Sequence, residues 1–388
     1  MNTSLYYMQE PTGWSESPDV FSFSSLSAID TCPLQWQLVH SAYSDLCPFP
    51  TRPNPSAVEG DIVHQVLDEL FKELAFVGLP SLGSKDFREV ITKMDITDKV
   101  EYLIADHEKR VSRHPRGGGF RVRTGTQQIV NRIIRLFRSE YPKAIPSASS
   151  APRPVSMSSI GSGVQLLPLI REKGALSEVR LVHPTLPFTG IIDLVRIADN
   201  NISIVDFKTG ASKASHRAQL LYYAVLWWRN TGAAPKYIEV RYLGKTEGSQ
   251  IEQEMLAESE IELARRIHRL TSLLNCPPAE PRLGDHCQYC DVRQFCKSYW
   301  QNANNSAFLA KGKSKTVDIE LVVKSHPASN GFLAETSNGT PCSVVYSADG
   351  VKVHGPFVIG EALRVLNGRV AEADKSIEFM PWTEVFHR

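Results

Sequence analysis

Two short runs near the middle of the chain alternate apolar and polar residues as neighbouring β-strands do. Residues 190–197 and 202–208 are largely apolar, and the A-D-N-N segment between them is typical of a turn. The pattern predicts a β-hairpin. Residues two apart on a strand lie on the same face, so Asp206 and Lys208 share a face, and Asp193 can share it from the adjoining strand.

The predicted hairpin places two carboxylates and an ammonium group where strands are otherwise apolar. Burial of these charges is costly unless something occupies the site. A divalent cation held by Asp193 and Asp206, with Lys208 directed at a water molecule, would explain the arrangement. Such a site is suited to the hydrolysis of a phosphodiester. The simpler alternative is an ordinary hairpin whose charges lie in solvent.

Helical periodicity prevails in much of the remaining chain before residue 315. The expected helices cover 24–40 (interrupted or beginning near Pro33), most of 60–141, 216–230 and 252–274. The expected strands cover 164–207 and 237–243. A Ser-, Pro- and Gly-rich linker or surface loop is expected at 144–163. Together these elements imply an α/β fold, a mixed sheet flanked by helices.

The pattern changes after Lys315 to short strands separated by turns. Strands are expected at 317–323, 331–335, 341–346, 351–358 and 377–379, with a helix or loop near 361–366. This spacing favours a small C-terminal β-barrel domain over 316–388, with an OB-fold as the first choice. An OB-fold would bind single-stranded nucleic acid. The alternative is a small β domain that contacts proteins.

Four short motifs follow one another along the chain. They are G-D-I-V-H ending at His64, G-I-I-D ending at Asp193, V-D-F-K-T-G beginning at Val205, and Q-L-L-Y-Y beginning at Gln219. The ordered set resembles the PD-(D/E)XK nuclease superfamily, in particular its RecB-like branch, over roughly residues 21–300. The resemblance implies a restriction-endonuclease-like domain with a helical insertion at about 60–145. One small departure is Asp68, which stands where Glu is common.

The resemblance also implies an active site. Lys208 would help to activate the attacking water. The residues that would hold Mg²⁺ or Mn²⁺ are His64, Asp193, Asp206 and the main-chain carbonyl of Phe207. From the residues alone, His64 borders the apolar stripe of a helix and could equally be a core or surface histidine.

Three further residues are implied to act near this site. Gln219 and Tyr223 lie four apart on an expected helix and therefore on one face; in the family they contact DNA or brace the site. Glu178 lies on an expected strand before the hairpin and is a candidate for the metal site or its surroundings. The plainer reading of Gln219 and Tyr223 is an ordinary helix surface.

The cysteines form a second constellation. Cys287, Cys290 and Cys296 lie within ten residues in a turn-rich segment, which suggests a metal site with a fourth ligand from elsewhere. Spacing does not choose among Cys32, Cys47, Cys276 and Cys342. Similarity to RecB-like nucleases that carry an iron–sulfur cluster, the AddB-type and CRISPR-associated exonucleases, implies Cys32 and a [4Fe–4S] cluster. Zinc is the alternative, and disulfides are disfavoured by the odd number of cysteines and the lack of a signal peptide.

The stretch from Arg110 to Arg123 holds five arginines, three adjacent glycines and no acidic residue. The glycines predict a mobile loop. Phosphate contact is a natural use of such a loop, and a merely solvated basic loop is the alternative. The candidate nucleic-acid-binding residues are Arg113, Arg116, Arg121 and Arg123.

Composition adds little to this interpretation. The net charge is +1, and no apolar run is long enough to span a membrane, so a cytoplasmic protein is expected. We expect a metal-dependent DNA nuclease that acts on single-stranded ends or flaps in repair, recombination, defence or CRISPR adaptation. The chain has no G-x-x-x-x-G-K-[ST] motif, so unwinding would need a helicase or other protein partner. The alternative is a non-catalytic DNA-binding or scaffold subunit.

Overall fold

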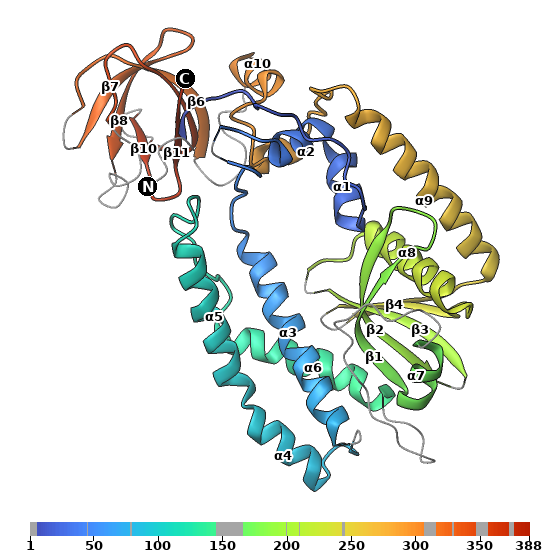
Figure 1. Cartoon of the computed structure of the whole chain (residues 1–388). Coiled ribbons are helices and arrows are strands. Elements are labelled where there is room, and N and C mark those ends of the chain that lie inside the picture. The colour runs from blue at the N-terminus through green and yellow to red at the C-terminus, as the bar shows by residue number, and fades with distance from the viewer. Residues whose placement is uncertain are drawn as a thin grey trace.

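The structure is a computed structural model of the chain. It describes residues 6–44, 46–77, 80–144, 166–198, 200–208, 210–242, 245–305, 316–327, 330–346, 356–371 and 376–388. Most of the expected loop at 144–163 and of the expected strand at 351–358 lies outside these residues. Figure 1 shows a ring-like arrangement of a mixed sheet, a group of helices, the cysteine segment and a C-terminal barrel.

A five-stranded mixed sheet organises the larger part of the molecule. Its strands are β1 (Ala175–Val182), β2 (Thr189–Ala198), β3 (Asn201–Lys208), β4 (Tyr237–Tyr242) and β5 (Lys245–Gln250), in that spatial order. β3 and β4 are parallel and the other neighbours antiparallel. The predicted hairpin is thus confirmed as β2–β3, and β5 is an edge strand that sequence reasoning missed.

The expectation of strands from residue 164 onwards is wrong at its start, because α7 (Leu166–Lys173) is a helix. Its proline, Pro168, lies in the first turn, where the missing N–H costs no intrahelical hydrogen bond. Leu166 and Ile170, four residues apart, are both buried, which is the spacing of a helix face.

Helices cover both faces of the sheet. α8 (Ala214–Thr231), α9 (Gln253–Leu274) and α1 (Phe23–Thr31) share one core with it. The helical arm, which we define as α3 to α6, shares the other core through Leu194, Val205 and Phe207. The arm comprises α3 (Pro55–Phe76), α4 (Lys85–Met94), α5 (Ile96–Ser112) and α6 (Thr126–Ala144). In the described residues no helix is both long and apolar enough to cross a membrane.

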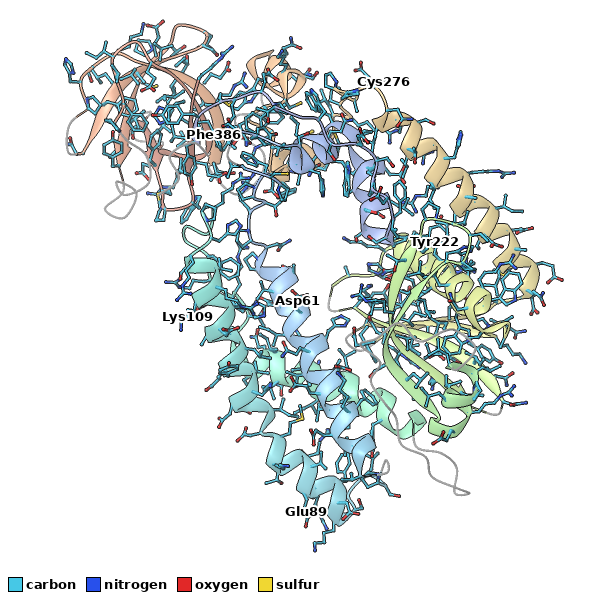
Figure 2. All side chains as sticks on the ribbon, in the orientation of Figure 1. Asp61, Glu89, Lys109, Tyr222, Cys276 and Phe386 are labelled. Carbon is cyan, nitrogen blue, oxygen red and sulfur yellow. The ribbon has the colours of Figure 1, made fainter. Side chains whose placement is uncertain are left out.

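The two ends of this region meet at the cysteine segment. α2 (Pro33–His40) follows α1 directly, and after α9 come the short helix η3 (Asp285–Tyr289) and α10 (Lys297–Asn305). These elements share a small core with the barrel, to which Leu366 and Phe386 contribute. Phe386, labelled in Figure 2, lies where the barrel adjoins the N-terminal segment.

The C-terminal region is a small closed barrel. β6 (Thr316–Val323), β7 (Gly331–Thr336), β8 (Pro341–Tyr346), β10 (Ser376–Phe379) and β9 (Ala362–Ala371) follow one another around it, and β9 pairs back with β6. A sixth strand, β11 (Glu384–His387), was not predicted and adds to β9. The described end of the expected strand at 351–358, residues 356–358, is not in a strand.

The expected helix or loop near 361–366 is wrong, because β9 is a central strand. The Asn367-Gly368 pair gives the sequence a turn-like appearance. In the structure Asn367 has a φ of 57° and lies beside a register shift in the β6–β9 pairing. Leu363 and Val365 pack into the barrel core, whereas Leu366 packs into the core shared with the cysteine segment. The strand is thus buried on both faces.

The barrel docks on the tip of the helical arm through the loop between α5 and α6. Arg116 is buried and donates from Nε and Nη2 to the two carboxylate oxygens of Glu384, at 2.6 and 2.8 Å. A Cβ on Gly118 would lie 2.5 Å from the carbonyl oxygen of Pro381. The glycines therefore let this loop pack closely against the barrel, which differs from the expected mobile loop. Lys109, labelled in Figure 2, marks the end of α5 nearest the barrel.

We predict that Glu384→Ala destabilises the protein by about 3–5 kcal/mol, because it leaves the buried Arg116 guanidinium without its counter-charge. Urea denaturation measures this loss. Arg369→Ala is the matched control: it breaks the exposed pair with Glu378 and should cost about 0–1 kcal/mol. Equal effects of the two substitutions would contradict this account of docking.

We also predict that the docked barrel loosens in acid. Burial opposes ionisation of Glu384, but Arg116 and Arg52 outweigh it and hold the pKa of this carboxyl below its usual value. A depressed folded pKa stabilises the fold above the unfolded value of about 4.3, and the stabilisation is lost as the pH falls through the folded value. Stability measured from pH 6 down to pH 3 should fall more steeply for the wild type than for Glu384→Gln.

Candidate active site and cysteine cavity

The β2–β3 hairpin brings three of the predicted site residues together. Lys208 Nζ lies 2.8 Å from Asp206 Oδ2, as expected for two residues on one face of β3. Leu194 pairs with Val205, so the next step in register sets Asp193 opposite Asp206. Asp193 Oδ2 also accepts the main-chain N–H of Phe207 at 2.8 Å. The two carboxylates and the ammonium group therefore converge at the end of the hairpin.

His64 and Glu178 complete a group of possible metal ligands. One ligand atom each from His64, Glu178 and Asp193 lies within 4.8 Å of the other two. His64 reaches the hairpin from α3, with Nδ1 3.6 Å from Asp193 Oδ2. Glu178 has a φ of 51°, which is rare for a residue with a side chain. The β1–β2 pairing leaves out Glu178 and Asp193, since Ser177 pairs with Leu194 and Val179 with Ile192. The strand is thus irregular at the point where Glu178 faces the site.

Negative charge accumulates at this site. Burial, followed by the charge of Asp193, raises the pKa of Asp206 to about 7, although Lys208 opposes the rise. Burial and the charges of Asp193 and Asp68 raise the pKa of Glu178 to about 7 as well. Carboxyl groups with raised pKa values have too little positive charge around them to balance their negative charge when they ionise. A divalent cation bound among them would supply that positive charge.

Sequence reasoning missed a cation beside Glu178. Lys72 forms an ion pair with Asp68 Oδ2, and Ser177 donates to Asp68 Oδ1 at 3.0 Å. His64, Asp68 and Lys72 are each four residues apart on α3, so they share one face of that helix. This spacing was the available signal, but it gains meaning only once α3 is known to pack against the sheet.

Gln219 and Tyr223 form a bonded pair on α8. Gln219 Nε2 donates to the Tyr223 hydroxyl at 2.8 Å. Burial raises the pKa of Tyr223, and Asp206, Asp193 and Glu178 add to the rise, which places the phenol within electrostatic reach of the site. A Cβ on Gly190 would lie 2.6 Å from Tyr223 Cε1. The glycine of the G-I-I-D motif therefore makes room for the tyrosine of the Q-L-L-Y-Y motif.

Four cysteines line a second, apolar cavity. They are the four predicted ligands: Cys32, Cys287, Cys290 and Cys296. Cys32 lies between α1 and α2, so the cavity joins segments more than 250 residues apart in the chain. Cys47 and Cys276 are exposed, and Cys342 lies in β8 of the barrel. Cys276 is labelled in Figure 2 at the outer edge of the molecule, beyond the end of α9.

Main-chain N–H groups point at the sulfur atoms of this cavity. Gln35 N–H donates to Cys32 Sγ and Gly284 N–H to Cys287 Sγ, each at 3.4 Å. Burial raises the pKa of Cys290 to about 12, although an N–H from Val292 opposes it. N–H donors suit sulfur atoms that carry negative charge, whereas burial without a cation disfavours that charge. Arg293, which also lines the cavity, supplies part of the positive charge that four thiolates would need, and a bound metal would supply the rest.

The arginines of the α5–α6 loop divide into two kinds. Arg113, Arg121 and Arg123 are exposed. Arg116 is held by Glu384 and donates from Nη1 to the carbonyls of Pro50 and Asp291. Its expected availability to phosphate is therefore not met, because its guanidinium joins the arm to the barrel.

Comparison with known proteins gives weak likenesses to solved structures and a match to a family model. No curated protein matches the chain in sequence. A solved structure titled "Crystal structure of SSO0001" is 17% identical over 35% of this chain and 68% of that chain, with a TM-score of 0.22. A structure of tetrameric p202 HIN2 is 16% identical over 21% of this chain, with a TM-score of 0.17, and this chain spans 45% of its length. Likenesses this weak say nothing about the fold or function of this chain.

The informative match is to a family model, that of the PD-(D/E)XK nuclease superfamily, over residues 20–297. This segment is most of the chain. It contains the hairpin with Asp193, Asp206 and Lys208, the helix with His64, and the four cysteines of the cavity. The chain therefore belongs to the PD-(D/E)XK nuclease superfamily.

Proposed function

We propose that this protein is a metal-dependent DNA nuclease. The observation that carries the proposal is the convergence of Asp193, Asp206 and Lys208 at the end of the hairpin, with His64 and Glu178 beside them. A purely DNA-binding or scaffold subunit, the second candidate, has no need for this complete set. Family membership supports a nuclease, and the geometry supports an intact one.

The donor set fits Mg²⁺ or Mn²⁺. Carboxylate oxygens are preferred by both ions and imidazole is acceptable to Mn²⁺. The residues that would hold the ion are His64, Asp193, Asp206, Glu178 and the Phe207 carbonyl. When bound, the ion would stabilise charge on the phosphate and lower the pKa of a water molecule.

The remaining groups have separate roles. Lys208, paired with Asp206, is placed to orient the attacking water and to stabilise negative charge on the phosphate. Tyr223 and Gln219 brace the same end of the sheet from α8. The positive charge of Lys72 offsets the negative charges of Asp68 and Glu178 and would limit the repulsion between these carboxylates before a metal binds.

Single-stranded ends or flaps are the proposed substrate, with a helicase or another protein partner supplying unwinding. The barrel supports this choice, since its closed strand order, with β8 and β10 parallel, is compatible with an OB-like fold. OB-folds bind single strands through stacking and backbone contacts. A cytoplasmic DNA-processing role is the proposed setting.

The cysteine cavity is proposed to hold a [4Fe–4S] cluster. Thiolates around one zinc ion lie about 3.8 Å apart, because each Zn–S bond is about 2.3 Å. Among the described cysteines, no three sulfur atoms lie within 4.8 Å of one another. The wider spacing supports a cluster over zinc, whereas the N–H groups aimed at sulfur suit the thiolates of either site. Its role would be structural, joining Cys32 to the segment after α9.

We predict that Lys208→Ala lowers cleavage of end-labelled single-stranded DNA in Mn²⁺ by at least about 100-fold, because positioned charge of this kind contributes that much to the rate. Mn²⁺ binding, measured by calorimetry, should persist in Lys208→Ala and be lost in Asp193→Ala. Lys213→Ala, which changes an exposed lysine just before α8, is the matched control. Full cleavage by purified Asp206→Ala would show that the active site lies elsewhere.

We predict that replacing any one of Cys32, Cys287, Cys290 or Cys296 with Ala removes the brown colour of anaerobically purified protein and lowers its melting temperature, since the cluster joins distant segments. Cys47→Ala and Cys276→Ala should leave both unchanged. The measurements are the visible spectrum, iron and zinc content, and thermal unfolding. Stoichiometric zinc without iron in the wild type would contradict the cluster while leaving the four ligands in place.

A further inference from the structure

A groove lies between the tip of the helical arm and the barrel, apart from the candidate active site. It has a volume of about 430 Å³. The α5–α6 loop forms one wall with Arg121 and Arg123, and the barrel forms the other with Pro381 and Trp382. The close approach of Gly118 and Gly119 to Pro381 and Trp382 holds these walls together.

The groove is positively charged. Four arginines line it and one carboxylate, Glu384, is the only acidic residue among the described lining residues. Arg116 and Arg52 are committed to Glu384 and Asp291. Arg121 and Arg123 are exposed, and no ion pair of theirs is found within the described ranges. Their charge is therefore available to an anionic ligand.

An aromatic side chain stands on the opposite wall. Trp382 is 46% exposed, although it is one of the largest apolar side chains. A Cβ on Gly119 would lie 3.6 Å from Trp382 Cε3, so the loop supports the indole ring on one side. An exposed, supported indole in the same groove as two arginines combines a stacking surface with phosphate-binding charges.

The basic wall leads directly towards the candidate active site. Thr124 donates from its N–H and its hydroxyl to the carboxylate of Glu59 on α3, at 3.1 and 2.7 Å. His64 lies five residues further along the same helix, about 7.5 Å away. The path from Arg121 through Thr124 and Glu59 to His64 is roughly 20 Å long, so its ends are separated by at most about six stacked nucleotides of one strand.

We propose that this groove is a binding subsite for single-stranded DNA, in which Trp382 stacks on a base and Arg121 and Arg123 contact the backbone within about six nucleotides of the scissile phosphate. The proposal rests on the proposed nuclease function and adds the location of the strand. It predicts that long substrates gain affinity from the groove, whereas substrates shorter than the span do not.

The test is fluorescence anisotropy with fluorescein-labelled oligothymidylates of about four and about sixteen nucleotides, at two salt concentrations and without added divalent metal. Trp382→Ala should weaken binding of the long oligonucleotide about tenfold, and Trp382→Phe should restore most of it. Arg121→Gln with Arg123→Gln should reduce the slope of log K against log salt by about 1.4. Binding of the short oligonucleotide should not change.

Arg88→Gln, an exposed arginine of α4 outside the groove, and Leu333→Ala, an exposed apolar residue of the barrel, are the matched controls. Both should behave as wild type. If Trp382→Ala lowers the melting temperature, which would show that it loosens the barrel, the test rests on the variant with Arg121→Gln and Arg123→Gln, whose side chains are exposed.

The outcomes separate the two proposals. Wild-type protein that cuts DNA while the groove variants bind the long oligonucleotide with unchanged affinity and salt slope would overturn the groove and leave the nuclease. Wild-type protein that binds through the groove but cuts no DNA would support the groove and overturn the nuclease. Wild-type protein that neither binds an oligonucleotide nor cuts DNA in Mn²⁺ would overturn both.

Discussion

Repulsion among buried carboxylates is the constraint around which the nuclease region is arranged. Asp206 and Glu178 both face Asp193, and their pKa values are raised because burial weakens the solvation of each charge. The surrounding elements each contribute a cationic or titratable group: α3 brings His64 and Lys72, and β3 brings Lys208. The site thus belongs to no single element, and it exists only when α3 packs against the sheet.

Buried arginines play the corresponding part in joining the barrel to the remainder of the chain. Arg293 of the cysteine segment bonds Asp318 of β6, with Nη2 3.1 Å from Oδ1. Arg364 of β9 donates to the main-chain carbonyl of Gln294, and Arg116 of the arm donates to Glu384 of β11. Because breaking a buried ion pair leaves a charge without compensation, the barrel, the cysteine segment and the arm are energetically coupled.

The sequence predicted features that depend on local periodicity. The face shared by Asp206 and Lys208 follows from the two-residue repeat of a strand, and the hairpin turn was readable at residues 198–201. Features set by packing between distant segments were not readable. The Asn367-Gly368 pair has the sequence of a turn, and only its pairing with β6 shows that it lies in a strand. Arg116 has the sequence context of a surface arginine, and only its bond to Glu384, 268 residues away, shows that it is buried. Lys72 gained a role only from its proximity to Glu178.

The glycine-rich loop between α5 and α6 has a backbone that is fixed in place but side chains that are exposed to solvent. Gly118 and Gly119 fix where the loop lies, because a side chain on Gly118 would collide with the backbone of the barrel. Arg121 and Arg123 belong to a segment that is anchored by hydrogen bonds from the main-chain N–H groups of Val122 and Thr124 to the carboxylates of Glu108 and Glu59. Their side chains can therefore be exchanged without moving the backbone, so the charge of this surface can be changed while the architecture beneath it stays the same.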